Sequence, residues 1–337
     1  MKIALDVTVR DGKPSSFTRI SHLHEEALQS IGMDPILWTG GPCKADILWS
    51  PWMHVSENWA GQGIGILHDV SPLLLDNRPG WKQWLRGKKF RRKLRQAVRT
   101  NAAFASVSLD AEMRFRAHFP TVAIKTQHVP HFVSSRLTQF AERDPAPVLR
   151  KLQLKPEFVL FVGAFRMHKN WVGLMNAWKS LVLSGRVSVP LVIAGETHRA
   201  GKELKRIQKE AWFLKTTHFL GAQGDENLSA LYQSCSCLVF PSFNEGFGLP
   251  PLEAMAFGAP VAASRVTAIP EVLGHAAEYF DPFNHCEIAD AIARIVDQPY
   301  RNEKLVKDSI AQADVYSAER TGRAMLDLSQ WVNRRRS

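Results

Sequence analysis

The segment over residues 237–258 constrains the fold more than any other part of this sequence. It begins with an apolar run over 237–240 and passes through a loop with two glycines. It then reads as a short helix that opens on Pro250 and Pro251 and ends at Gly258. Proline suits the first helical turn, where its missing N–H is not needed, and glycine suits the position just past the end. A strand that leads through a loop into a helix is half of a βαβ unit, which predicts a parallel sheet.

The start of this helix is predicted to bind an anion. Gly246 and Gly248 carry no side chain that would keep a ligand away from the backbone. The free N–H groups of the first helical turn point at the same loop. Two carboxylates bracket it, Glu245 before the glycines and Glu253 in the helix. A phosphate site flanked by acids favours a ligand with a diphosphate in its middle and hydroxyl-rich groups at both ends, and a nucleotide sugar has this composition.

Short apolar runs alternate with helical segments along the whole chain. This alternation predicts an α/β fold with a parallel sheet in each half. With 337 residues, the chain is at the limit of a single core, so two domains are expected. Two prolines among polar residues place the linker at 134–150. We therefore expect one domain over 1–147, a second over 148–316, and a C-terminal helix over 317–337 that packs back on the first domain.

Composition and cysteine usage indicate a cytosolic protein with free thiols. The chain is 45% hydrophobic and 22% charged, and no apolar run approaches the ~18–20 residues of a membrane span. Residues 1–9 become polar too soon for a signal peptide and read as a buried strand. The four cysteines, at 43, 235, 237 and 286, show no spacing typical of a disulfide or metal framework.

The net charge of +11 is concentrated in one helix. Ten Lys or Arg and no Asp or Glu lie between Arg78 and Arg99. Apolar residues recur within 81–99 at spacings near 3.6, which predicts a helix with a basic opposite face. This pattern is typical of a helix on an anionic bilayer, and an ordinary core-facing helix is the alternative. No recognised nucleic-acid-binding motif accompanies the charge, so nucleic acid is not an expected partner. The predicted membrane or acceptor patch comprises Trp81, Trp84, Lys88, Lys89, Arg91, Arg92 and Lys93.

A histidine–aspartate pair, His68-Asp69, ends the apolar run over residues 63–67. Open α/β sheets bind ligands outside the carboxyl ends of their strands, so His68 is a candidate hydrogen-bonding or acid/base group. A structural histidine that caps a loop is the alternative.

Two basic residues follow the first apolar run of the second half. Arg166 and Lys169 lie between the strand expected over 158–163 and the helix expected over 171–183. There they could meet a diphosphate, and surface salt bridges are the alternative. The corresponding loop of the first half, residues 10–17, has one glycine, a weak signal that fits an anion site or a plain connection.

Several of these segments together resemble the large family of retaining glycosyltransferases that includes bacterial mannosyl-, glucosyl- and rhamnosyltransferases, often called family 4. Glu245 and Glu253 have the family's spacing of two glutamates separated by seven residues. The first domain matches only around His68-Asp69 and residues 106–108. Its loop over residues 11–17 departs from the glycine-rich loop usual in the family. The matching segments of the second domain are residues 161–170, 219–221, 225–232, 241–250, 252–258, 269–272 and 280–282.

The resemblance implies a GT-B fold, in which two Rossmann-like domains face each other across a cleft. The second domain would hold the donor, with Arg166 and Lys169 on its diphosphate and Glu253 on the ribose hydroxyls. Glu245 would act near the reacting carbon as a catalytic residue. His68 and Asp69 would complete the catalytic set from the first domain. The other residues expected to hold the donor are Gly163, Gly246, Phe247, Gly248 and Leu249.

The implied reaction is transfer of a hexose, with retention, from a nucleotide-diphosphate sugar to a hydroxyl of a glycan acceptor. Two cations and a helix N-terminus can stabilise a leaving diphosphate without a metal, and a carboxylate can support a cation-like anomeric carbon. No Asp-x-Asp pair is present in the sequence, so no metal and no other cofactor is expected. Same-face attack and a covalent route through a carboxylate both stay open.

The expected setting is bacterial surface polysaccharide or lipopolysaccharide synthesis. The acceptor would be lipid-linked, and the protein would be cytoplasmic and peripheral at the inner face of the cell membrane. GDP-mannose is the favoured donor, because the context of His68-Asp69 resembles bacterial mannosyltransferases. Two other functions stay open: another nucleotide-sugar enzyme of this fold, such as an epimerase, and a non-enzymatic basic binding protein. The sequence does not indicate an oligomeric state.

Overall fold

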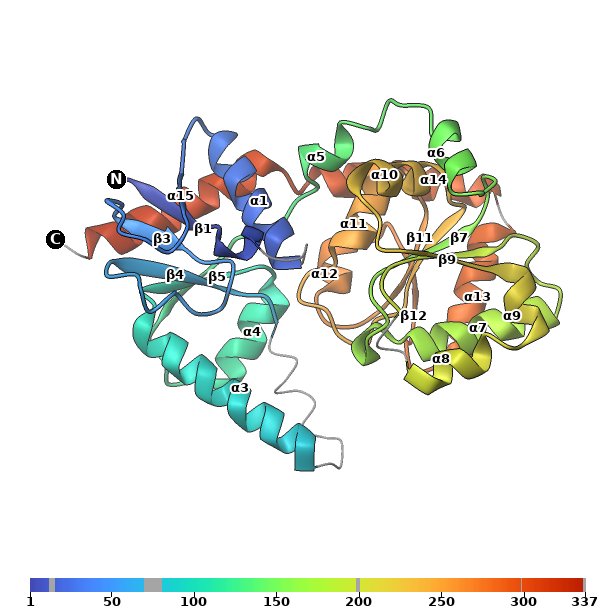
Figure 1. Cartoon of the computed structure of the whole chain (residues 1–337), viewed down its shortest axis with the longest axis horizontal. Coiled ribbons are helices and arrows are strands. Elements are labelled where there is room, and N and C mark those ends of the chain that lie inside the picture. The colour runs from blue at the N-terminus through green and yellow to red at the C-terminus, as the bar shows by residue number, and fades with distance from the viewer. Residues whose placement is uncertain (12–15, 70–80, 198–200, 298, 336–337) are drawn as a thin grey trace. The chain divides into compact units, whose positions relative to one another are not determined.

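A computed structural model describes residues 1–11, 16–69, 81–197, 201–297 and 299–335. The chain forms two compact units, which are described separately (Figure 1). The first unit contains Met1–Phe132 and Tyr316–Ser337, and the second contains Val133–Val315. The boundary therefore lies about 15 residues before the expected one at 147. Residues 133–147 join the second unit because the short helices α5 (Ser135–Thr138) and α6 (Ala146–Lys151) pack on α10 (Asp225–Ser234).

The first unit is built on a six-stranded parallel sheet with the order β2-β1-β3-β4-β5-β6. Helices α1 and α15 cover one face of the sheet, and α3 and α4 lie on the other (Figure 1). The strands are β1 (Ile3–Asp6), β2 (Ile36–Trp38), β3 (Ile47–Trp49), β4 (Gln62–Leu67), β5 (Ala103–Ser106) and β6 (Lys125–His128). The helices are the 3-10 helix η1 (Thr8–Asp11), α1 (Ser16–Gln29), α3 (Trp81–Thr100), α4 (Leu109–His118) and α15 (Ala318–Arg334).

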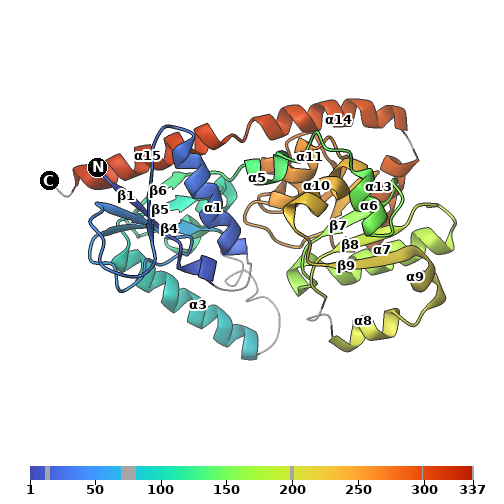
Figure 2. The ribbon, with the colours of Figure 1, turned by 45° about the horizontal axis from the view of Figure 1, so that its top comes forward.

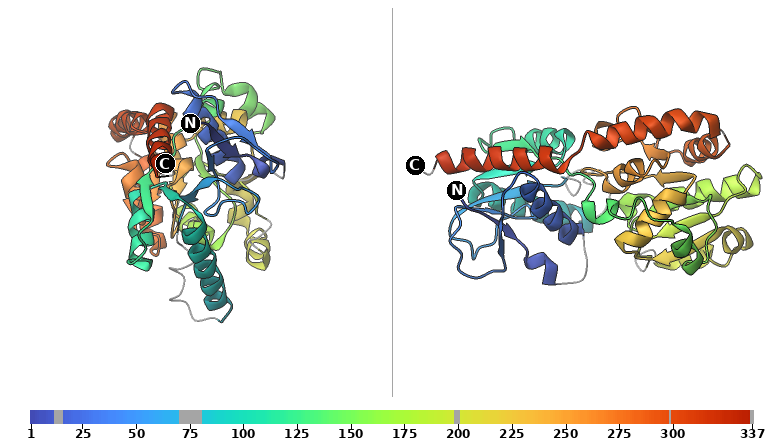
Figure 3. Two further views of the ribbon diagram at one scale, coloured as in Figure 1. Left: turned by 90° about the vertical axis from the view of Figure 1, so that its left-hand side faces the viewer. Right: turned by 90° about the horizontal axis from the view of Figure 1, so that it is seen from above.

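The last helix, α15, closes the first unit by packing beside α1 (Figures 2 and 3). The approach is close at Gly322, where a Cβ atom would lie 2.1 Å from the carbonyl oxygen of Ala27. Hydrogen bonds also join α15 to the rest of the unit. The indole N–H of Trp49 donates to Ser329 Oγ at 2.9 Å, and Thr321 Oγ1 donates to the carbonyl of Pro130 at 2.8 Å.

The second unit contains another six-stranded parallel sheet, with the order β12-β11-β10-β7-β8-β9. Its inner strands are apolar and buried throughout, as expected for a sheet covered on both faces. The strands are β7 (Val159–Val162), β8 (Leu191–Ala194), β9 (Thr217–Gly221), β10 (Cys237–Phe240), β11 (Val261–Ser264) and β12 (Glu278–Phe280). The remaining helices are η3 (Met167–Lys169), α7 (Trp171–Leu183), α8 (Gly201–Ile207), α9 (Ala211–Thr216), α11 (Leu249–Ala256), α12 (Ile269–Leu273), α13 (His285–Val296) and α14 (Pro299–Asp314).

The α/β fold with a parallel sheet in each half is confirmed. The sequence did not indicate β12 or α14, and residues 201–216 contain two helices, α8 and α9. The four cysteines are free thiols, as the sequence indicated. Cys235 and Cys237 are buried free thiols, and burial raises the pKa of Cys235 to about 12.

Candidate active site

The strand order places a ligand site of the second unit between β7 and β10. Chain connections run outward from β7 to β8 on one side and return through β10 on the other. Ligands of open α/β sheets bind at such a switch point, outside the carboxyl ends of the strands. The loops that leave this edge are residues 163–169 after β7 and residues 241–248 after β10. These are the loops in which the sequence places most of the donor-binding residues.

Lys169 and Glu245 meet at this edge as an ion pair. The Lys169 Nζ atom lies 2.7 Å from Glu245 Oε1, and the two side chains are only 16% and 13% exposed. The same ammonium lies 4.8 Å from the centre of the Phe240 ring. Arg166, three residues earlier, is exposed. The structure thus brings together the predicted diphosphate cation and the predicted catalytic carboxylate.

Hydrogen bonds tie the loops that carry the ion pair into one frame. The N–H of Phe243 donates to the carbonyl of His168 at 2.7 Å, which joins the loop after β10 to η3. The N–H of Glu245 donates to Thr267 Oγ1 at 3.0 Å, which joins it to the loop after β11. Asn170 caps α7 and donates its side-chain N–H to the carbonyl of Pro282, after β12, at 2.7 Å. The sequence did not single out Thr267 or Asn170, because these contacts join distant segments.

Three glycines of the site meet backbone demands that other residues would not. Gly163 and Gly248 have φ angles of +149° and +102°, a region that favours glycine. Gly248 is also the N-cap residue of α11, and the helix begins next to Pro250 as the sequence predicts. At Gly195, just after β8, a Cβ atom would lie 2.0 Å from the carbonyl oxygen of Gly163. The segments that follow β7 and β8 are therefore packed too tightly there for any side chain.

Glu253, the predicted ribose ligand, lies in α11 and is 2% exposed. Its Oε2 atom accepts a hydrogen bond from the buried hydroxyl of Tyr232 at 2.9 Å. Tyr232 comes from α10 and was not singled out by the sequence. The Glu253 carboxylate is thus buried and positioned by a side chain of the neighbouring helix α10. Its contact with a ribose is a prediction. Phe247 is buried, and Gly246 and Leu249 are half-buried.

His68, at the end of β4 in the first unit, has a defined tautomer. Its Nε2 atom lies 2.7 Å from the carbonyl oxygen of Pro51, and a carbonyl only accepts, so Nε2 carries the hydrogen. Burial lowers the pKa of His68, against smaller opposing effects of the Pro51 carbonyl and Asp69. The neutral ring therefore keeps Nδ1 as a hydrogen-bond acceptor or base.

His131 lies beside His68, and His24 lies beside His131. The His131 ring is 6.0 Å from that of His68 and 6.4 Å from that of His24. Burial is the main cause that lowers the pKa of His131 well below its usual value, and the neighbouring imidazoles add to it. Phe17 contributes an edge-on ring 5.4 Å from His68. Asp69 is half-exposed. This cluster depends on contacts among three separate segments of the chain, which the sequence alone does not reveal.

The predicted basic patch lies on α3. Lys88, Lys89, Arg92 and Lys93 are exposed and Arg91 is half-buried. Leu94 and Ala97 on the other face are fully buried and pack with Phe104 and Phe115. The helix therefore has the amphipathic division that the spacing predicts. The side chains of Trp81 and Trp84, and residues 12–15 of the first loop, lie outside the described residues.

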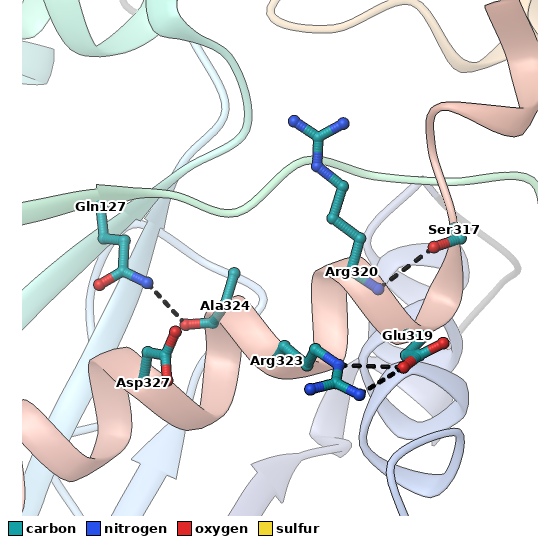
Figure 4. Close-up of a pocket in the computed structure, with 7 residues that line it drawn as sticks. All are labelled: Gln127, Ser317, Glu319, Arg320, Arg323, Ala324 and Asp327. Carbon is teal, nitrogen blue, oxygen red and sulfur yellow. Dashed lines mark hydrogen bonds and ion pairs between the residues drawn. The ribbon is translucent and has the colours of Figure 1, made fainter.

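A separate surface hollow of about 390 Å³ lies beside α15 (Figure 4). Most of its lining residues are of polar types: Gln127 donates to the carbonyl of Ala324 at 2.9 Å, and Arg323 pairs with Glu319 at 2.6 Å. None of the predicted site residues lines it. The seven residues around it are Gln127, Ser317, Glu319, Arg320, Arg323, Ala324 and Asp327.

No described helix has the length and apolar content needed to cross a membrane. Within the same part of the chain, no three His, Cys, Asp or Glu side chains are grouped so that they could hold a metal ion.

Comparison with known proteins identifies relatives of both units. The family model for glycosyl transferases group 1 matches residues 147–312. The chain is 35% identical over 190 residues to O-antigen chain mannosyltransferase B of Escherichia coli, a match that covers 54% of this chain and 49% of that protein. It is 28% identical over 264 residues to the serotype-specific mannosyltransferase WbdA of Escherichia coli, covering 76% and 31%. The matches thus span about half or less of these relatives' lengths.

Solved structures match almost the whole chain. WaaG, a glycosyltransferase involved in lipopolysaccharide biosynthesis, superimposes with a TM-score of 0.76 at 14% identity, covering 97% of this chain and 99% of that one. Sucrose-phosphate synthase from Thermosynechococcus elongatus gives 0.75 at 18% identity, covering 98% and 99%. Anabaena HepE, solved with UDP-glucose, gives 0.73 at 16% identity, covering 98% and 100%. The chain has the GT-B fold, and its residues 147–312 belong to the glycosyl transferases group 1 family.

Proposed function

We propose that this chain is a retaining glycosyltransferase that moves a hexose from a nucleotide-diphosphate sugar to a hydroxyl of a glycan. The observation that carries the proposal is the Lys169–Glu245 ion pair at the switch point of the second sheet. A buried ammonium and carboxylate in contact provide the two charges that this reaction needs at one place. The family match covers the same loops.

The ammonium of Lys169 would serve the leaving group. As the bond from the anomeric carbon to the diphosphate oxygen breaks, negative charge builds on that oxygen. Fixed cations and backbone N–H groups aimed at such charge are usually the largest single contribution to catalysis. Lys169, the exposed Arg166 and the N-terminus of α11 are the groups available here.

The carboxylate of Glu245 would serve the sugar. A negative charge beside the anomeric carbon stabilises its cation-like state. In same-face attack, the acceptor oxygen bonds to that carbon where the diphosphate leaves, and the hydroxyl proton passes to a leaving phosphate oxygen. In the covalent alternative, a carboxylate of the protein attacks first and the acceptor then displaces it.

GDP-mannose is the proposed donor. Mannosyltransferases of Escherichia coli match over more than half of the chain, and D-inositol 3-phosphate glycosyltransferases match over a similar share. The neighbours solved with UDP or UDP-glucose are 14–16% identical and support the fold alone. The base is tested by thermal unfolding of the full chain with GDP, UDP, ADP or dTDP. We expect the largest rise in Tm with GDP. A larger rise with another nucleotide would identify that nucleotide as part of the donor and would leave the proposed binding residues unchanged.

A lipid-linked acceptor at an anionic membrane surface is proposed from helix α3. Its exposed lysines and arginines can contact anionic headgroups while Leu94 and Ala97 anchor it to the unit. This would place the protein at the inner face of the cell membrane, in O-antigen or related polysaccharide synthesis. Co-sedimentation with vesicles that contain phosphatidylglycerol is expected for the wild type and lost when Arg91, Arg92 and Lys93 are changed to Glu. Equal binding by both proteins would reject the membrane contact.

The reaction is tested by incubating the full chain with radiolabelled GDP-mannose and membranes from the source bacterium. A transferase moves label into the glycolipid fraction only when membranes are present and releases GDP in equal amount. An epimerase would convert the sugar with no acceptor. If the label stays in intact GDP-mannose under every condition, both the transferase and the epimerase activity are rejected.

A further inference from the structure

An exposed aromatic pair lies among the loops at the carboxyl edge of the second sheet. Phe283 is 72% exposed, more than any other aromatic residue that the structure describes. Its ring stacks on that of half-buried Phe243, with centroids 4.8 Å apart and an interplanar angle of 28°. Isolated exposed apolar residues are ordinary, whereas contiguous ones mark binding surfaces. The pair is therefore a candidate surface that the donor site does not use.

Hydrogen bonds fix the turn that presents Phe283. The N–H of Phe283 donates to Asp281 Oδ1 at 2.9 Å, and the N–H of Asp281 donates to Glu287 Oε2 at 2.9 Å. Asn284 caps α13 by accepting from the N–H of Cys286 at 3.0 Å. An ordered turn before α13 thus exposes the Phe283 ring to solvent. A polar residue at position 283 would lose no contact with the core.

The same turn is joined to the candidate active site. Asn170, the residue after Lys169, donates to the carbonyl of Pro282 at 2.7 Å. Phe243 donates its N–H to the carbonyl just before Lys169, and it precedes Glu245 by two residues. Both rings therefore belong to the hydrogen-bonded frame that holds the ion pair.

We infer that the Phe243–Phe283 pair is a platform for the apolar face of a pyranose ring, and this rests on the proposed function. One face of a pyranose presents mainly C–H groups, while its hydroxyls point outward. A flat aromatic surface covers that face and leaves the hydroxyls paired with water, so no polar group is buried without a partner. The ring would be that of the acceptor residue, since the pair lies outside the predicted donor-binding residues and the acceptor must approach Glu245.

Binding of methyl α-D-mannopyranoside and of an α-linked mannobiose tests the inference. Saturation-transfer NMR on the full chain with GDP present measures the affinity for wild type, Phe283→Ala and Phe283→Trp. We expect Phe283→Ala to weaken saccharide binding at least fivefold and Phe283→Trp to retain it. Leu214→Ala is the matched control, because Leu214 is a 68% exposed apolar residue on α9, and it should bind as wild type.

Equal affinity of Phe283→Ala and wild type, or no saccharide binding by the wild type at millimolar concentration, would overturn the inference. Decyl phosphate is the sugar-free probe: if Phe283→Ala weakens its binding and leaves the mannosides unaffected, the pair holds an alkyl chain and the inference is wrong.

The GDP-induced rise in Tm is measured on the same samples. Its absence in the wild type rejects the proposed donor, whereas a normal rise in Phe283→Ala shows that the donor site is intact. In the transfer assay, a higher KM for the acceptor in Phe283→Ala supports the inference, and a higher KM for GDP-mannose alone would overturn it.

Discussion

Lys169 Nζ lies 2.7 Å from Glu245 Oε1 across two loops that are 76 positions apart in the chain. The two groups leave different strands of the sheet, β7 and β10, which are hydrogen-bonded neighbours. With both side chains mostly buried, each charge depends on the other for stabilisation. A bound diphosphate would add a second partner for the ammonium, so the pair links donor binding to the position of Glu245.

Lys169→Met is expected to lower kcat/KM for transfer by about 10²–10³-fold, because a preorganised charge at the leaving group is lost. It is also expected to destabilise the second unit by about 1–3 kcal/mol, since the Glu245 carboxylate loses its partner. Steady-state kinetics and urea unfolding measure the two effects. Arg186→Met is the control: its pair with Asp290 is nearly half-exposed, so activity should not change. A Lys169→Met protein with wild-type kcat/KM would remove Lys169 from the site.

Tyr232→Phe is expected to weaken GDP binding and to cost about 1–3 kcal/mol, because the buried Glu253 carboxylate loses its hydrogen bond. Calorimetric titration with GDP and urea unfolding measure the two effects. Tyr279→Phe provides the comparison, since it removes a hydrogen bond to the carbonyl of Gly274 in the same unit. If both variants bind GDP equally well, Glu253 does not depend on Tyr232 to hold the nucleotide.

Gly195→Ala is expected to lower the urea midpoint strongly, with a cost above about 2 kcal/mol, because overpacking displaces the backbone. The new methyl would lie 2.0 Å from the Gly163 carbonyl. Gly41→Ala, where a Cβ atom meets open space, should change the midpoint little. Equal midpoints for the two variants would show that β7 and β8 can separate at no cost.

Acidification from pH 7.5 to 5.5 is expected to destabilise the first unit through His131. Burial lowers the pKa of the folded ring, so on acidification the unfolded ring binds a proton first, near its ordinary value of about 6.5. The free energy of unfolding therefore falls as the pH drops through that value. His131→Asn should flatten the dependence of Tm on pH, whereas the exposed-site control His285→Asn should not. Parallel curves for wild type and His131→Asn would contradict this account.

His68 is expected to determine the fall in kcat/KM on the acid side of the pH profile. Its pKa is lowered, so the ring is neutral at pH 7 and protonates only below its ordinary value of about 6.5. If Nδ1 of the neutral ring accepts a hydrogen bond from substrate, kcat/KM falls on acidification below that value, and His68→Asn removes this limb. An unchanged acid limb in His68→Asn would assign it to another group.

What could be predicted from the sequence was local. Pro250 and Gly258 mark the ends of a helix that the structure gives as Leu249–Ala256, and the basic helix expected over residues 81–99 is Trp81–Thr100. Lys169 and Glu245 could be named because each lies in a strand-to-helix loop with its own motif. Their ion pair could not be foreseen, because it depends on β7 and β10 being neighbours.

What could not be predicted depended on contacts between distant segments. Tyr232 holds Glu253 across 21 positions, and Pro51 fixes the tautomer of His68 across 17 positions. The sequence of helix α14 shows no clear alternation of apolar and polar faces. Its position in the fold depends on its packing against α11 and α12. The boundary between the units also lay earlier than the two prolines indicated, because α6 packs on α10.

The most direct test of the central claim is the transfer of mannose from GDP-mannose to the membrane acceptor by wild type and Glu245→Gln at equal concentration. Circular dichroism confirms that both are folded. The account predicts an acceptor-dependent, α-linked product from the wild type and a rate at least 10²-fold lower for Glu245→Gln. Equal rates for the two proteins would show that the carboxylate paired with Lys169 is not part of the reaction.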